Sequence, residues 1–130
     1  MHKEFLTTAA ILGGIAVLLG AFGAHGLKAY ASEQQLNTYE TAVRYMFYHV
    51  FALALCGILY QAFPVSGVVT SGKLFMAGMA VFSGSLYLMT ALSLGGSDKF
   101  KWLGAITPVG GLLLVAGWFT LAYTLFSYRK

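Results

Sequence analysis

The stretch that decides the fold is FLTTAAILGGIAVLLGAFGAHGL, residues 5–27, in which 23 consecutive residues carry no charge. A helix rises ~1.5 Å per residue, so about 20 apolar residues cross the ~30 Å hydrocarbon core of a bilayer. Three more uncharged runs follow, of 28, 24 and 27 residues, at residues 45–72, 74–97 and 102–128. Each run is long enough for one crossing and too short for two.

The four runs predict an all-α integral membrane protein, an antiparallel bundle of four transmembrane helices with short loops. A bilayer accepts only helices and closed barrels, because backbone polar groups must be paired inside it. The runs are continuous rather than alternating, which disfavours a barrel. The expected spans cover about residues 5–26, 42–63, 73–94 and 102–126, within one domain over residues 1–130.

Composition excludes most other classes of protein. Apolar types make up 58% of the 130 residues and charged types 9%, against about 25% charged in soluble domains. Disorder requires the reverse balance. The net charge of +4 favours membrane lipids with anionic headgroups as partners, and with no basic stripe and no soluble domain nucleic acid is not an expected partner. We therefore expect a multi-pass protein of the cell membrane.

Four spans place both termini on one side of the membrane, here called the terminal side. This side carries four basic residues: Lys3, Lys73, Arg129 and Lys130. The opposite side also carries four: Lys28, Arg44, Lys99 and Lys101. Cytoplasmic loops are enriched in Lys and Arg, so the terminal side is expected to be cytoplasmic if Arg44 belongs to a helix rather than a loop.

Small residues line one face of the first span. Ala9, Gly13, Ala16, Gly20 and Gly23 step by four and three, and span three has a shorter series that includes Gly84. Small faces let helix backbones approach closely in lipid. The face serves either packing inside the bundle or contact with a second copy or a larger membrane complex.

Span four contains Thr107-Pro108 followed by Gly110-Gly111. Proline inside a helix removes one hydrogen bond and clashes with the preceding turn. A kink near the start of this span is therefore expected. It is either a packing bend or a place where freed carbonyls line a polar cavity.

Polar side chains inside a membrane are costly and indicate functional sites. In the expected topology, six of them fall in the leaflet on the opposite side: His25, Arg44, His49, Tyr87, Thr90 and Thr107. This one-sided polarity predicts a hydrated pocket that opens to that side. The alternative is structural, with Arg44 paired to Glu40, His25 capping its helix and the hydroxyls bonded to their own helices.

The chemistry available to such a pocket is binding rather than catalysis. The planar guanidinium of Arg44 suits an anion such as a lipid phosphate. Two histidines without a carboxylate at ligand spacing do not make a metal site, and neither a catalytic triad nor a phosphate loop occurs. We therefore expect no metal, no cofactor and no enzyme activity. A redox or haem-associated subunit, with His25 and His49 as axial ligands, is a minor alternative.

Four segments resemble the motifs of a known family. They are residues 20–27 (GAFGAHGL), 41–45 (TAVRY) with 48–49 (YH), 82–87 (FSGSLY), and 104–111 (GAITPVGG) with 117–118 (GW). The chain is identified as a member of the small bacterial inner-membrane proteins catalogued as domain of unknown function 423, which have a eukaryotic transmembrane relative. It departs from the pattern at Met46, where that family often has glutamine.

The resemblance implies a four-span membrane protein and no particular activity. Because five of the six polar residues, all except Thr90, lie within the family's motif segments, it favours a functional pocket over a structural role. The leading interpretation is a protein that binds an anion or a lipid headgroup in one leaflet. The alternative is a structural or assembly subunit of a membrane complex, packed through its glycine seams.

Overall fold

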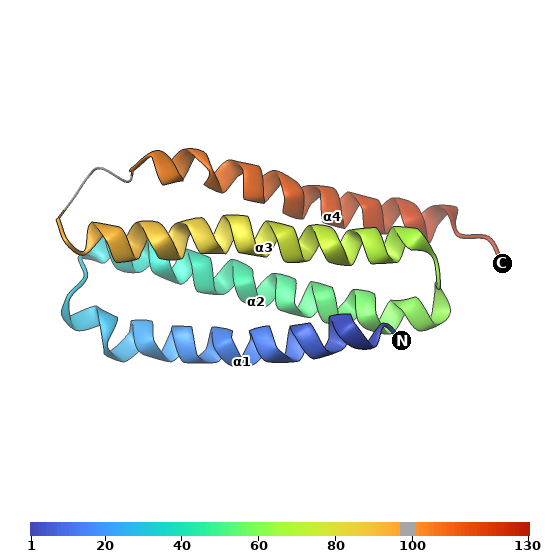
Figure 1. Cartoon of the computed structure of the whole chain (residues 1–130), viewed down its shortest axis with the longest axis horizontal. Helices are drawn as coiled ribbons and strands as arrows, with labels where there is room; N and C mark the ends of the chain where they lie inside the picture. Colours follow the sequence, from blue (N-terminus) through green and yellow to red (C-terminus); the bar gives the residue numbers. More distant parts are fainter. Residues whose placement is uncertain (97–100) are drawn as a thin grey trace.

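The computed structural model describes residues 1–96 and 101–130 (Figure 1). It is helical throughout the described segments, and its elements in chain order are α1 (Lys3–His25), η1 (Leu27–Ala29), α2 (Glu33–Ala62), α3 (Ser66–Ser93), η2 (Lys101–Ala105) and α4 (Thr107–Ser127). The four α-helices lie within segments long and apolar enough to cross a membrane. This confirms the predicted all-α membrane fold.

The helices lie side by side in chain order, and each runs antiparallel to the next (Figure 1). Both termini lie at the same end of the bundle. Each helix packs mainly on its neighbour in sequence, so α1 rests on α2, α2 on α3, and α3 on α4. The short connections from α1 to α2 and from α2 to α3 favour this order, because helices joined by a few residues pack as antiparallel neighbours.

Helix α2 begins well before the predicted span. Ser32 Oγ accepts a hydrogen bond from the backbone N–H of Gln35 at 3.2 Å, and Gln35 Oε1 accepts one from the N–H of Ser32 at 2.8 Å. This capping box satisfies two backbone donors at the first turn and sets the helix start at Glu33. The 30-residue helix is ~45 Å long, so its first turns extend beyond the hydrocarbon core.

Pro108 lies in the first turn of α4 rather than inside the helix. The 3-10 helix Lys101–Ala105 occupies the start of the predicted span, and the α-helix begins at Thr107. The expected bend is thus a change of helix type at Ile106. Pro108 costs no hydrogen bond there, because first-turn N–H groups have no partner within the helix.

The core lies mainly between α2, α3 and α4. Its largest fully buried side chains include Leu53, Val68 and Phe75. From α1 it receives chiefly Phe5, Ala9 and Ala16. The outer faces of α1 and α4 carry exposed aliphatic and aromatic side chains, as expected of helices whose solvent is lipid.

Candidate functional site

Five of the six predicted pocket residues lie towards the end of the bundle where α1 and α3 end and α2 and α4 begin, whereas His49 lies near the middle of α2. Their surroundings differ. His25 and Arg44 are exposed, Tyr87 and Thr107 are half-buried, and His49 and Thr90 are buried. No single pocket encloses them, so their contacts show what each one does.

His49 joins three helices. Its Nδ1 lies 2.8 Å from the carbonyl oxygen of Tyr45, one turn earlier on α2. Its Nε2 accepts a hydrogen bond from the indole N–H of Trp118 on α4 at 3.1 Å. A carbonyl can only accept, so the hydrogen-bond network assigns the ring proton to Nδ1 of a neutral imidazole. Both ring nitrogens are therefore occupied, and no lone pair is left for a metal or haem iron.

Phe75 of α3 completes this cluster. Its ring centroid lies 5.6 Å from that of His49 and 5.0 Å from that of Trp118. A Cβ on Gly117 would come within 2.7 Å of the Phe75 ring. Gly117 therefore has a packing reason to lack a side chain, and the Gly117-Trp118 pair of the fourth motif serves the α3–α4 contact.

Tyr87 and Tyr39 form a second interhelical cluster. The Tyr87 hydroxyl donates to Met46 Sδ at 3.4 Å, and the Tyr39 hydroxyl donates to the carbonyl oxygen of Leu19. The two tyrosine rings meet edge to face, with centroids 5.4 Å apart. At Met46, where the family pattern often has an amide, the thioether sulfur of this chain accepts the tyrosine hydroxyl.

The remaining hydroxyls are also satisfied within the protein. Ser83 Oγ donates to the carbonyl oxygen of Ala42 at 2.8 Å, and Ser85 Oγ lies 2.6 Å from Thr107 Oγ1. Thr90 bonds back to Leu86 of its own helix. Among the described residues, no buried polar side-chain atom lacks a partner.

Among the described residues, the buried and half-buried members of the group are thus bonded within the protein, and His49, Tyr87 and Thr107 bond to other helices, instead of sharing the single hydrated pocket expected from the sequence. The helical turn explains the difference. Residues five apart, such as Arg44 and His49, point ~140° apart on a helix of 3.6 residues per turn. Equal depth in the membrane does not bring side chains to one face.

The small-residue seam of α1 faces α2. Ala16 is completely buried, and Cβ atoms added at Gly13 and Gly20 would touch Val50 and Val43 at 3.5 Å. A Cβ at Gly23 would come within 2.5 Å of the Tyr39 ring. The seam thus packs inside the bundle. Gly84 differs from the predicted packing role, because nothing lies within 4 Å of a Cβ added there.

The glycines of the predicted kink also serve packing. A Cβ at Gly110 would come within 2.4 Å of the backbone nitrogen of Phe82, so α3 and α4 touch backbone to backbone there. At Gly111 the nearest atom of the Phe82 ring would be 3.8 Å away, an ordinary contact. Of the two glycines, Gly110 is the one at which α3 and α4 approach too closely for a side chain.

Two grooves lie on the surface formed by residues 1–96. The first, here called the interfacial groove, has a volume of about 260 Å³ and lies between α1 and α2. It is lined by Gly20, Gly23, Ala24, Tyr39, Glu40, Val43 and Arg44. It contains one of the six predicted pocket residues, Arg44, and it combines a cation, a carboxylate and three residues with little or no side chain.

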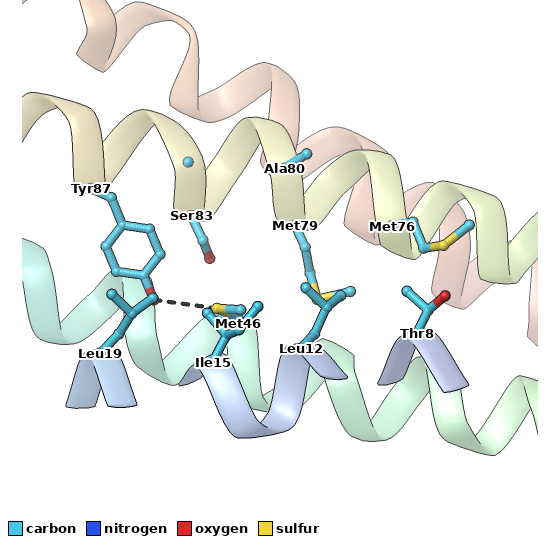
Figure 2. A pocket seen from close by; sticks show the side chains of 11 residues that line it. Thr8, Leu12, Ile15, Leu19, Met46, Met76, Met79, Ala80, Ser83 and Tyr87 are labelled. Carbon is cyan, nitrogen blue, oxygen red and sulfur yellow. Dashed lines mark hydrogen bonds between the residues drawn. The ribbon is translucent and has the colours of Figure 1, made fainter. Parts of the chain in front are cut away.

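The second, here called the membrane groove, has a volume of about 390 Å³. It is lined by four residues of α1 from Thr8 to Leu19, six of α3 from Met76 to Tyr87, and Met46 of α2. Figure 2 shows Tyr87 and Leu19 at one end and Thr8 and Met76 at the other. The lining is almost wholly apolar.

The described residues contain no cluster of three or more His, Cys, Asp or Glu side chains that could hold a metal ion. The thiol of Cys56 is buried and free. The chemistry available at the two grooves is therefore binding through charge, hydrogen bonding and apolar contact.

Comparison with known proteins places the chain in a family. A model of the family described as protein of unknown function (DUF423) matches residues 19–111. The chain belongs to this family. This confirms the resemblance carried by the four motif segments.

Members from other bacteria match almost the whole chain. The UPF0382 membrane protein of Staphylococcus haemolyticus is 36% identical over 126 residues, covering 97% of this chain and 98% of the relative. The UPF0382 membrane protein YwdK of Bacillus subtilis is 38% identical over 129 residues, with the same coverage. No solved structure matches. The chain is thus a membrane protein of an uncharacterised family.

Sequence reasoning missed the Trp118–His49 hydrogen bond and the membrane groove. The tryptophan had a partial signal, because an indole N–H inside a membrane needs an acceptor and an imidazole nitrogen can provide one. No sequence signal indicated the membrane groove. It depends on how far α1 and α3 stand apart over α2, and only the packed structure fixes that spacing.

Proposed function

We propose that this protein binds the phosphate-bearing headgroup of an anionic membrane lipid in the interfacial groove, with Arg44 as the binding residue. The proposal rests on the exposure of the Arg44 side chain and on its lack of a bonding partner among the described residues. This side chain is exposed on the groove and forms no ion pair or hydrogen bond with the described residues, including Glu40 one turn earlier.

The depth of Arg44 suits a lipid phosphate. Counted back from Ala62, the ~20 residues that cross the hydrocarbon core end at about residue 43 of α2. Arg44 therefore lies at the border of the core, and its long side chain reaches the headgroup region. Tyr39 and Glu40, one turn further out, belong to that region.

The shape of the groove supports the same ligand. Gly20, Gly23 and Ala24 leave the α1 wall low, so a headgroup can approach the guanidinium across it. Arginine binds phosphate through two parallel N–H groups, which gives orientation as well as charge. Glu40 repels an anion in the same groove and limits the affinity, which makes binding reversible and dependent on lipid charge.

We also propose that the protein lies in the cell membrane with both termini in the cytoplasm. Arg44 lies eleven residues after the start of α2, whereas Lys73 lies seven residues after the start of α3 and so is closer to its loop; we therefore count Lys73, and not Arg44, with the loop charges. The terminal side then has one more basic residue at its surface than the opposite side. Lys99, on the opposite side, lies outside the described residues.

The other function considered, an assembly subunit that packs through glycine seams, loses its main argument here. The seam of α1 that carried it is occupied by α2. Homo-oligomers and larger complexes remain compatible with the exposed faces, but no contact favours them over lipid.

The test is lipid retention by purified protein. Wild type, Arg44→Gln and Arg129→Gln are reconstituted in vesicles of phosphatidylcholine with phosphatidylglycerol, extracted gently, and examined by native mass spectrometry. Arg129 is an exposed arginine on the terminal side and serves as the matched control. A charge-assisted contact contributes about 1.5–3 kcal/mol, so Arg44→Gln should reduce bound phosphatidylglycerol about tenfold or more.

The Arg44→Lys variant separates charge from geometry. If the two-pronged contact matters, lysine restores only part of the retention. Equal retention by wild type, Arg44→Gln and Arg129→Gln would contradict the proposal.

A further inference from the structure

We infer that the membrane groove holds one acyl chain of a zwitterionic phospholipid from the leaflet on the terminal side. The groove is separate from the interfacial groove, and the inference does not depend on Arg44. It rests on the width of the groove, the state of its polar atoms, and the charges at its ends.

The width admits a hydrocarbon chain and not a helix. The lining extends over twelve residues on α1 (Thr8 to Leu19) and twelve on α3 (Met76 to Tyr87), which is ~16 Å of helix. A whole helix of that length, ~10 Å across, would fill roughly 1,200 Å³, well above the groove volume of about 390 Å³. An α-helix with side chains is ~10–12 Å across, so a helix of a second copy cannot enter.

The lining requires an apolar occupant. The hydroxyl of Ser83 is bonded to Ala42, and that of Tyr87 to Met46 (Figure 2). Neither hydroxyl proton is left for a ligand. Methionines such as Met76 and Met79 adapt to irregular flexible shapes, which suits a chain with many conformers.

Residues at the two ends fix the direction of the chain. At the end of Leu19 and Tyr87, the Tyr39 hydroxyl bonds to the Leu19 carbonyl and the Tyr39 ring lies against Tyr87. We infer that these aromatic rings, together with the tyrosine–backbone contact, close that end. A chain therefore enters from the end of Thr8 and Met76, which lies towards the terminal side.

The open end carries one charge of each sign. Glu4 lies one turn before Thr8 on α1, and Lys73 lies one turn before Met76 and Ala77 on α3. Both side chains are exposed, and no ion pair joins them within the described part of the chain. The pair is complementary to a phosphate and an ammonium group carried by one headgroup, as in phosphatidylethanolamine.

Two glycines provide a matched test. A Cβ added at Gly84 or at Gly14 meets nothing within 4 Å, but Gly84 lines the membrane groove and Gly14 does not. Gly84→Leu should fill the groove, and Gly14→Leu should place the same side chain elsewhere in the lipid-facing surface. Thermal unfolding of both variants checks that each is folded.

The measurement is native mass spectrometry of protein extracted from vesicles that contain equal parts of phosphatidylethanolamine and phosphatidylglycerol. Wild type and Gly14→Leu should retain one phosphatidylethanolamine, and Gly84→Leu should lose it. Lys73→Gln combined with Glu4→Gln should abolish the preference for phosphatidylethanolamine over phosphatidylglycerol.

Three results would overturn the inference. If Gly84→Leu retained as much phosphatidylethanolamine as Gly14→Leu, the acyl chain would not lie in the groove. If wild type retained phosphatidylethanolamine and phosphatidylglycerol equally, Glu4 and Lys73 would not select the headgroup. A change of the wild-type oligomer to a monomer in Gly84→Leu, without loss of lipid, would make the groove a contact between copies.

Discussion

The indole N–H of Trp118 donates a hydrogen bond of 3.1 Å to Nε2 of His49. This bond links α4 to α2, two helices that are not consecutive in the chain. The imidazole is held on its other side by the carbonyl of Tyr45. A histidine that the sequence marks as a ligand or proton carrier is thus part of the internal bonding of the bundle.

Removing the indole donor should weaken the bundle modestly. Hydrogen bonds between membrane helices contribute about 0.6 kcal/mol on average and up to ~1.7 kcal/mol. Trp118→Phe keeps an aromatic ring against Phe75 but leaves Nε2 without its donor, so we expect a loss of about 1 kcal/mol in the free energy of unfolding. Denaturant unfolding in micelles measures it.

A double-mutant cycle with His49→Ala tests the pair itself. The double variant should be less destabilised than the sum of Trp118→Phe and His49→Ala. Strict additivity would show that the two side chains stabilise the bundle independently.

Substitution by alanine should destabilise the protein at Gly110 and not at Gly111. In Gly110→Ala, the new Cβ would lie 2.4 Å from the backbone nitrogen of Phe82, which cannot move without shifting α3. In Gly111→Ala, the nearest atom is a ring carbon at 3.8 Å. We expect about 3 kcal/mol of destabilisation at Gly110, typical of strong overpacking, and none at Gly111.

Thermal unfolding of the two alanine variants under identical conditions makes the comparison. Both substitutions raise helix propensity equally, so that contribution cancels. A Gly110→Ala protein as stable as wild type would show that α3 and α4 are further apart than described here.

Glu40→Gln should strengthen lipid binding at the interfacial groove. The substitution removes the negative charge that shares the groove with Arg44 and keeps a side chain of similar size. Retention of phosphatidylglycerol should rise above wild type, and the increase should shrink at high salt, because the charges lie at the membrane surface. Glu33→Gln, at the exposed start of α2, is the control. A lower retention in Glu40→Gln would mean that the carboxylate binds part of the headgroup.

Cysteine labelling tests the orientation of the protein. Gln34 is exposed in the first turn of α2 on the opposite side, and Lys130 ends the chain on the terminal side. In intact cells an impermeant thiol reagent should modify Gln34→Cys and spare Lys130→Cys until the cells are lysed. The native Cys56 is buried and provides the background. The reverse pattern would place the termini outside the cytoplasm.

The sequence determined the fold more closely than the site. The charge-free runs located four helices, because the length and polarity of a bilayer leave few alternatives. The Ser32–Gln35 capping box set the start of α2 for a local reason. The α1 seam indicated close packing, and the structure supplied the partner, α2.

The site could not be predicted from the sequence, because the depth of a residue in the membrane does not determine the direction in which its side chain points. The sequence places the six polar residues in one leaflet, but the turn of each helix and the pairing of neighbours decide which of them meet. His49 turns towards Trp118, and Arg44 turns towards the interfacial groove. The effect of Pro108 was also beyond the sequence pattern. A proline bends a helix from its interior but not from its first turn, and the structure places Pro108 in the first turn of α4.

The most direct test of lipid binding uses the small number of arginines in the chain. Arg44 and Arg129 are the only two, so Arg129→Lys leaves Arg44 alone and Arg44→Lys leaves Arg129 alone. Solid-state NMR of arginine-labelled protein in phosphatidylglycerol-containing bilayers measures how lipid phosphorus dephases each guanidinium signal. We predict strong dephasing at Arg44 and little at Arg129; equal dephasing at both, or none at Arg44, would contradict a headgroup site in the interfacial groove.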